Sequence, residues 1–286
     1  MTDLPKRIAL VTGATHGIGV WTALGLATPG STIAIVARNK VLGEQTRAWL
    51  ADRAPAAQID LLIADLSSLA EVRRLAAAVK ARYPRLDLLV NNAGLGRPQR
   101  ELTPDGFERT FAVNHLAPFV LTLELLDLLK RSAPARIVNV GSQAADRASL
   151  DLGNLQAERH FSIMGAYGQS KLALLLFTVE LARRLDGTGV TVNIVHPGVV
   201  ATNIFNLGGV LGLLVTILTP VIRLFLLCAE QGAKTTLHVA TAPELAGVTG
   251  RYFRECREAA PNPLAQDHAL AAALWDRSVA LTGVGM

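Results

Sequence analysis

The chain has 286 residues, of which 50% are hydrophobic but only 5% aromatic, so its core is expected to be aliphatic. Its net charge of +5 is spread along the chain without a long run of lysine or arginine, which argues against nucleic acid as a partner and suits an anionic small molecule or surface. Two cysteines, Cys228 and Cys256, and six histidines show no spacing of a disulfide framework or metal site, so no metal is expected.

Short apolar runs alternate with segments of helical length. The runs predict buried strands at 8–13, 32–38, 59–66, 86–94, 136–142 and 190–198, and a last short strand at 250–253. The clearest helical segments between them are 41–54, 69–82, 105–130 and 165–185. This alternation predicts an α/β fold with a doubly wound parallel sheet, the Rossmann fold. No linker or repeat divides the chain, so residues 1–286 are expected to form one domain.

The first predicted strand runs into the glycine-rich turn VTGATHGIG and then a helix. Missing side chains at Gly13, Gly17 and Gly19 would let backbone N–H groups and the positive helix end approach a pyrophosphate. An isolated match of this kind can also reflect tight packing, but its place between a strand and a helix favours a dinucleotide site. The residues expected to line that site are Gly13, Thr15, His16, Gly17, Ile18 and Gly19.

The second predicted strand ends in VARNK, where an acid would bind the ribose 2′-hydroxyl of NAD. Arg38 instead offers a cationic fork to the 2′-phosphate of NADP, with Asn39 and Lys40 as helpers. The alternative for Arg38 is a solvated strand end. After the third strand, Asp65 is placed to meet the adenine amino group, and Leu66 is expected beside it.

Several motifs follow in the order and approximate spacing of the short-chain dehydrogenase/reductase family: TGATHGIG, NNAG (91–94), Asn114, Ser142, YGQSK and HPG (196–198). Within it, the segments ARNK, FAVNHLAPF, YGQSKLA and TAPELAGVTGRYF are most similar to the retinol dehydrogenase branch. The resemblance implies an NADP-dependent oxidoreductase acting on a CH–OH group, with Asn114, Ser142, Tyr167 and Lys171 as catalytic residues.

Tyr167 and Lys171 are four positions apart, so on a helix they share one face, although a helix with a wet first turn would show the same pair. In the catalytic interpretation, Lys171 and the positive nicotinamide lower the pKa of Tyr167 from about 10 towards neutrality. Tyr167 could then exchange a proton with the substrate oxygen, which Ser142 would also bind.

The resemblance also assigns supporting roles. Lys171 would hold the nicotinamide ribose, and Asn114 would hold a water that links this lysine to solvent; the alternative for Asn114 is a helix residue that bonds locally. Further residues expected at the cofactor are Asn91, Ala93, Gly94, Pro197, Gly198, Val200 and Thr202. For HPG a structural turn is nearly as good an explanation, and His196 is taken as structural.

Two segments are expected to choose the substrate. Residues 150–165 lengthen the separation of Ser142 and Tyr167 to 25 residues, more than is usual in the family. Within 203–228, the apolar run 207–228 carries a single charge, Arg223. An apolar lid is favoured for this run, with a membrane span or an interfacial or oligomer-contact helix as alternatives. We therefore expect a hydrophobic alcohol, ketone or aldehyde of terpenoid, steroid or polyketide size.

Few residues precede the first glycine turn, too few for a signal peptide, so a cytoplasmic location is expected, with peripheral membrane contact through 207–228 left open. The resemblance implies homodimers or homotetramers formed through helix pairs. The rival function is a catalytically weak NADP(H)-binding regulatory or scaffold protein of the same fold.

Overall fold

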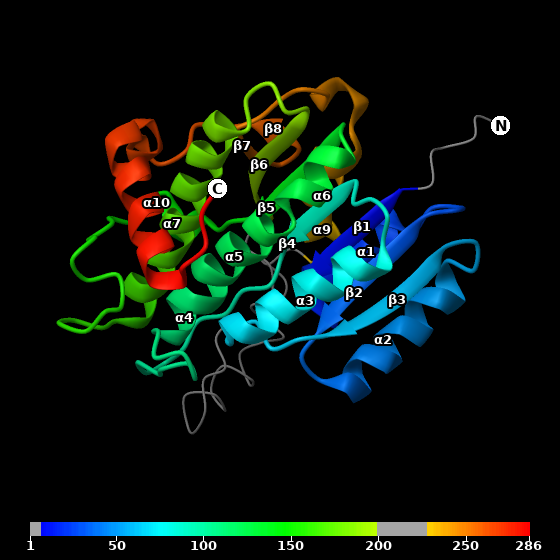
Figure 1. The fold of residues 1–286 in the computed structure, drawn as a ribbon, viewed down its shortest axis with the longest axis horizontal. Helices are drawn as coiled ribbons and strands as arrows, with labels where there is room; N and C mark the ends of the chain where they lie inside the picture. The colour runs from blue at the N-terminus through cyan, green and yellow to red at the C-terminus, as the bar shows by residue number, and fades with distance from the viewer. Residues whose placement is uncertain (1–6, 199–227) are drawn as a thin grey trace.

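The computed structural model describes residues 7–198 and 228–286. Its centre is one sheet with the strand order β3-β2-β1-β4-β5-β6-β7-β8 (Figure 1). The parallel strands are β1 Ile8–Thr12, β2 Thr32–Ala37, β3 Gln58–Ile63, β4 Leu88–Asn91, β5 Ala135–Val140, β6 Val190–His196 and β7 Tyr252–Arg254. The doubly wound parallel sheet is thus confirmed. The short antiparallel strand β8, Arg257–Glu258, was not predicted because two exposed polar residues carry no apolar pattern.

The helices lie between the strands and cover both faces of the sheet. Their bounds are α1 Gly17–Leu26, α2 Lys40–Arg53, α3 Leu69–Arg82, α4 Arg109–Phe111, α5 Ala117–Glu124, α6 Leu126–Arg131, α7 Ile163–Arg184, α9 Ala229–Thr241 and α10 His268–Thr282. Short polar side chains start several of them: Asn39, Ser68, Ser162 and Asp267 each accept a hydrogen bond from a backbone N–H of the first turn.

The helix predicted over 105–130 is wrong in its start and in its continuity. The buried Glu108 carboxylate accepts hydrogen bonds from the N–H groups of Thr110 and Phe111, so the helical structure begins only at Arg109. It then passes through a π-helical turn, η1 Ala112–Leu116, before α5 and α6. Such turns are frequent at functional sites, and this one contains Asn114.

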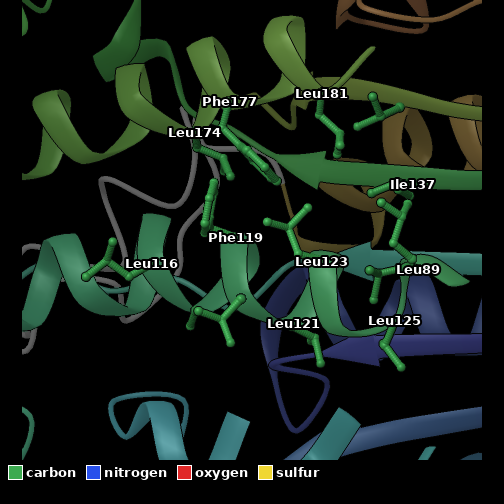
Figure 2. Packing of buried hydrophobic residues seen from close by; sticks show 14 of the residues in the cluster. Leu89, Leu116, Phe119, Leu121, Leu123, Leu125, Ile137, Leu174, Phe177 and Leu181 are labelled. Carbon is green, nitrogen blue, oxygen red and sulfur yellow. The ribbon is translucent and has the colours of Figure 1, made fainter. Parts of the chain in front are cut away.

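Alternating side chains along each strand divide the core between the two faces. In β1, Leu10 packs with the layer of α3, α5 and α7, whereas Ala9 and Val11 pack with α1 and α9. Figure 2 shows the first layer, where Phe119 of α5 lies close to Phe177 of α7. Both faces are therefore apolar, as the aliphatic runs indicated.

The C-terminal helix α10 packs against α7 and seals the outer side of this layer (Figure 1). The Trp275 ring lies 5.1 Å from that of Phe119 and 5.9 Å from that of Phe177, between ring centroids. The Arg184 guanidinium lies 4.2 Å from the Trp275 centroid. Trp275 therefore anchors α10 to α5 and α7.

Among residues 7–198 and 228–286, no helix combines the length and apolarity that a bilayer span requires. The same ranges contain no group of three or more His, Cys, Asp or Glu side chains arranged to hold a metal ion. The expected lid at 207–228 lies outside the described residues, apart from Cys228, which caps α9.

Candidate active site

The turn after β1 is built for close approach to its backbone. Gly13 has φ +64°, a left-handed conformation, and a Cβ there would lie 2.8 Å from the Cα of Ala93. A Cβ at Gly19 would overlap the carbonyl oxygen of Gly13. Helix α1 begins at Gly17 and receives no side-chain cap from His16, which leaves its first N–H groups suited to an anion. The turn therefore fits the pyrophosphate of a dinucleotide.

Two residues with no role assigned from the sequence lock this turn to the loop after β4. Thr12 Oγ1 accepts hydrogen bonds of 3.0 Å from the N–H groups of Asn92 and Ala93. Asn92 Nδ2 donates to the carbonyls of Thr12 and Gly13, at 2.8 and 3.1 Å. The sequence signal that could have identified Asn92 is its place as the second asparagine of NNAG, directly after a strand that neighbours β1.

The residues predicted to select NADP lie at the end of β2. Arg38 and Lys40 are exposed and make no ion pair within the described part of the chain, so both charges can meet a phosphate. Asn39 Oδ1 accepts a hydrogen bond of 3.1 Å from the N–H of Leu42. The oxygen of Asn39 thus caps α2, and only its amide nitrogen remains to assist Arg38.

Asp65 follows β3 at the same edge of the sheet. Its Oδ1 accepts a hydrogen bond of 2.9 Å from the N–H of Ser67, and its own N–H donates to Glu71 Oε2 at 2.7 Å. These bonds fix the carboxylate in place. Leu66 is half-buried against the core.

The side chain of Asn91, a residue expected at the cofactor, faces the protein interior. It is only 2% exposed, and its Nδ2 donates to Thr122 Oγ1 at 3.1 Å and to Asn139 Oδ1 at 2.8 Å. The side chain therefore joins β4 to α5 and β5, and a cofactor could contact only the Asn91 backbone. Sequence spacing located the strand end but not the direction of the side chain.

Tyr167 and Lys171 lie on α7, and both residues are buried, with 5% and 3% of their surface exposed. Lys171 Nζ is 6.0 Å from the Tyr167 ring centroid and donates a hydrogen bond of 2.8 Å to the carbonyl of Val140 at the end of β5. Ser142 follows that strand and hydrogen-bonds Tyr167 through its side chain. Its Oγ also accepts from the N–H of Ala144 at 3.2 Å. The structure thus brings together the phenol, hydroxyl and ammonium.

Asn114 joins this group to the loop after β4. Its Oδ1 accepts from the N–H of Leu95 at 2.8 Å, and its Nδ2 donates to the Leu95 carbonyl at 2.8 Å and to Ser170 Oγ at 2.9 Å. Ser170 Oγ in turn donates to the Tyr167 carbonyl at 2.7 Å. These partners are 19 and 56 residues away, so the side chain does not bond locally. Gly94 leaves room for the side chains of Asn114 and Lys171 beside this loop, since a Cβ at Gly94 would lie 3.3 Å from Asn114 Oδ1 and 3.0 Å from Lys171 Nζ.

The backbone carbonyl of Asn114 lies four residues before a proline. In a regular α-helix the Asn114 carbonyl would accept a hydrogen bond from residue 118, which is proline and has no N–H. The carbonyl therefore lacks its α-helical partner. This backbone oxygen, close to α7, is a suitable acceptor for a water molecule.

Burial is the largest influence on the pKa values of Tyr167 and Lys171. It lowers the pKa of Lys171 to about 8. It raises the pKa of Tyr167, opposed by the hydrogen bond with Ser142. This direction applies to the chain without cofactor, whereas the expected lowering involves both Lys171 and the positive nicotinamide. The expected lowering stays a prediction for the chain with the nicotinamide bound.

A cavity of about 1210 Å³ lies beside Ser142 and Tyr167. The segment 142–169 forms most of its described lining, and His196, Gly198 and Arg254 complete it. This lining mixes polar side chains with apolar ones such as Ala148 and Met164. Within it, Asp146 accepts hydrogen bonds from the Tyr252 hydroxyl at 3.0 Å and from Arg254 at 2.6 Å. The described wall thus supplies part of the expected apolar character, and the sequence places the rest at 207–228.

The HPG segment, residues 196–198, is the end of the first described range. His196 is buried, and burial lowers its pKa to about 4, so it is neutral at pH 7, consistent with a structural role. Pro197 and Gly198 are half-buried, and Gly198 has φ +86°. Val200 and Thr202 lie outside the described residues.

Comparisons with known proteins agree with this geometry. Residues 7–207 match the family model described as short chain dehydrogenase. The chain is 40% identical over 284 residues to Retinol dehydrogenase 13 from Homo sapiens, covering 98% of this chain and 86% of that protein.

Two solved structures are also similar. An uncharacterized protein from Mycobacterium paratuberculosis has a TM-score of 0.78 and 32% identity, with 99% of this chain and 96% of that chain covered. The complex of Pseudomonas aeruginosa RhlG with NADP has a TM-score of 0.68 and 30% identity, with 87% and 94% covered. The chain belongs to the short-chain dehydrogenase/reductase family of oxidoreductases, and within it resembles the retinol dehydrogenases.

Proposed function

We propose that the chain is an NADP(H)-dependent oxidoreductase that interconverts a hydrophobic alcohol and its ketone or aldehyde. The observation that carries this proposal is the cluster of Tyr167, Ser142 and Lys171 beside a cavity, at the sheet edge where open α/β folds bind ligands. The retinol dehydrogenase name of a relative supports a long apolar alcohol or aldehyde as substrate.

The cofactor would lie along the carboxyl ends of β1 to β4. The glycine turn would hold the pyrophosphate, Arg38 and Lys40 the 2′-phosphate, and Asp65 the adenine amino group. RhlG, a similar protein, has a structure with NADP, which supports this choice of cofactor. When bound, the nicotinamide supplies or accepts the hydride.

The chain's own side chains handle the proton. The hydroxyls of Ser142 and Tyr167 would bind the substrate oxygen, and Tyr167 would donate its proton in reduction or accept the alcohol's proton in oxidation. With a pKa of about 8, Lys171 is mostly protonated at pH 7. Its charge would stabilise the phenolate left on Tyr167, while also holding the nicotinamide ribose.

Asn114 would complete a path for protons from solvent. Its side chain fixes the loop after β4 to the catalytic helix, and its backbone carbonyl lacks an α-helical partner because residue 118 is proline. A water on that carbonyl would connect Lys171 to solvent and allow Tyr167 to recover its proton.

The decisive variant is Tyr167→Phe, which removes the hydroxyl but keeps the ring. We expect it to lose retinaldehyde and dodecanal reduction at least a hundredfold, with NADPH affinity unchanged. Tyr83→Phe is the matched control, because Tyr83 is also a buried tyrosine but hydrogen-bonds Asp60, away from the cluster. Full turnover by Tyr167→Phe would remove the proposal.

The rival, a weakly active NADP(H)-binding regulatory protein, would bind NADPH tightly yet reduce no member of a broad carbonyl panel. Cytoplasmic location and assembly into homodimers or homotetramers stay predictions. Cell fractionation and sedimentation measure them directly.

A further inference from the structure

The side chain of Gln169 attaches the loop before α7 to the helix that carries Tyr167 and Lys171. Its Oε1 accepts a hydrogen bond of 3.0 Å from the N–H of Asp151. Its Nε2 lies 3.2 Å from the carbonyl of Asn154, to which it donates, and 3.5 Å from that of Leu155. The amide of Gln169 therefore acts as donor and acceptor on the same stretch of loop backbone.

The position of Gln169 makes this attachment relevant to the site. It lies on α7 between Tyr167 and Lys171, two residues from each. Together with Asp151 and Asn154, it lines the cavity beside Tyr167. The same side chain thus forms part of the cavity wall and fixes the neighbouring part of that wall relative to the catalytic phenol.

A second attachment holds the far side of the loop. Gln156 Oε1 accepts from the N–H of Glu108 at 2.7 Å, and the Gln156 carbonyl accepts from Arg100 Nε at 2.9 Å. Ala157, which follows, is 5% exposed and has φ +49°, uncommon for a residue other than glycine. With this anchor in place, loss of the Gln169 bonds would loosen residues 151–155 without unfolding the loop.

We propose that Gln169 determines substrate size selectivity by holding residues 151–155 at a fixed distance from Tyr167. This inference rests on the proposed function. A long substrate that fills the cavity would contact the wall that Gln169 positions. A short one would reach only Ser142 and Tyr167, so its binding would not depend on the loop.

The test compares Gln169→Met, similar in length but without the amide, with the wild type on retinaldehyde and propanal. Loss of two or three hydrogen bonds that order the wall should raise KM for retinaldehyde about tenfold. The KM for propanal, kcat for both aldehydes and the NADPH dissociation constant should change less than about twofold. Hydrogen exchange at the Asp151 amide, which loses its acceptor, should accelerate at least tenfold.

Two further variants separate a positioning role from general destabilisation. Gln169→Glu keeps an acceptor for the Asp151 N–H but no donor for the two carbonyls, so its KM for retinaldehyde should fall between those of wild type and Gln169→Met. Gln45→Met makes the same substitution on the exposed side of α2 and should match the wild type throughout.

If Gln169→Met changes KM equally for both aldehydes, or leaves KM for retinaldehyde unchanged, the assignment of Gln169 is overturned. In that case an inactive Tyr167→Phe would still uphold the proposed function. If the wild type reduces neither aldehyde, the proposed function fails first, and the selectivity assignment fails with it.

Discussion

Lys171 is a buried cation whose charge is unfavourable for folding. Replacing it should change how the stability of the folded chain depends on pH. The residue is 3% exposed, donates to the Val140 carbonyl, and has no carboxylate ion pair among the described residues. Burial lowers its pKa from 10.5 to about 8. Lys171→Met removes the charge and keeps a side chain of similar length.

The size of the effect follows from the pKa. A difference of about 2.5 units corresponds to roughly 3 kcal/mol. Between pH 8 and 10.5 the unfolded state binds more protons at this lysine than the folded state, so the stability of the wild type rises with pH. The full penalty is present below pH 8 and disappears above 10.5. Between pH 7 and 9.5 the wild type should gain about 2 kcal/mol relative to Lys171→Met.

Urea unfolding at pH 7, 8 and 9.5, without nicotinamide, measures this difference. Lys234→Met, at an exposed lysine of α9, should follow the wild type in parallel. The unpaired Val140 carbonyl left in Lys171→Met adds a cost that does not vary with pH, so it does not affect the comparison. A gap between wild type and Lys171→Met that stays constant with pH would refute the reasoning.

Three other substitutions probe the cofactor site and the core. Arg38→Glu should weaken NADPH binding ten- to a hundredfold but not NADH binding, and equal losses in a fluorescence titration would contradict the 2′-phosphate assignment. Gly19→Ala should abolish dinucleotide binding in the same titration, because its Cβ would overlap the Gly13 carbonyl, and wild-type affinity would count against the glycine cradle. Trp275→Ala should destabilise the chain by about 3–5 kcal/mol in urea unfolding, and a loss below about 1 kcal/mol would show that α10 is not anchored there.

The strands were predictable because they are buried on both faces and read as continuous aliphatic runs. The helix at 105–130 was not, since its start depends on the Glu108 carboxylate and it is interrupted by a π turn at Ala112–Leu116 that its apolar pattern does not reveal. Helix α10 was missed although its buried residues Ala271, Leu274, Trp275 and Ser278 follow helical spacing. That helix could have been predicted from the periodicity.

Arg38, Asp65 and Ser142 follow strand ends, as their place in the sequence indicated, whereas the directions of site side chains needed the structure. The inward turn of Asn91 and the bridge from Gln169 to a loop depend on contacts that no local pattern encodes. The raised pKa of Tyr167 likewise results from burial by elements far apart in the chain.

The central claim is that a bound nicotinamide makes the Tyr167 hydroxyl acidic enough to exchange a proton near neutral pH. The chain has three tyrosines, and burial raises the pKa of both others, that of Tyr252 to about 12 and that of Tyr83 beyond its ordinary range. Ultraviolet absorbance of phenolate between pH 6 and 10 therefore reports Tyr167 alone, with Tyr167→Phe as background.

In the chain alone we predict a Tyr167 titration above that of an unburied phenol, and a titration shifted downward by at least about two pH units when NADP⁺ is bound. Identical titration curves with and without NADP⁺ would contradict the account.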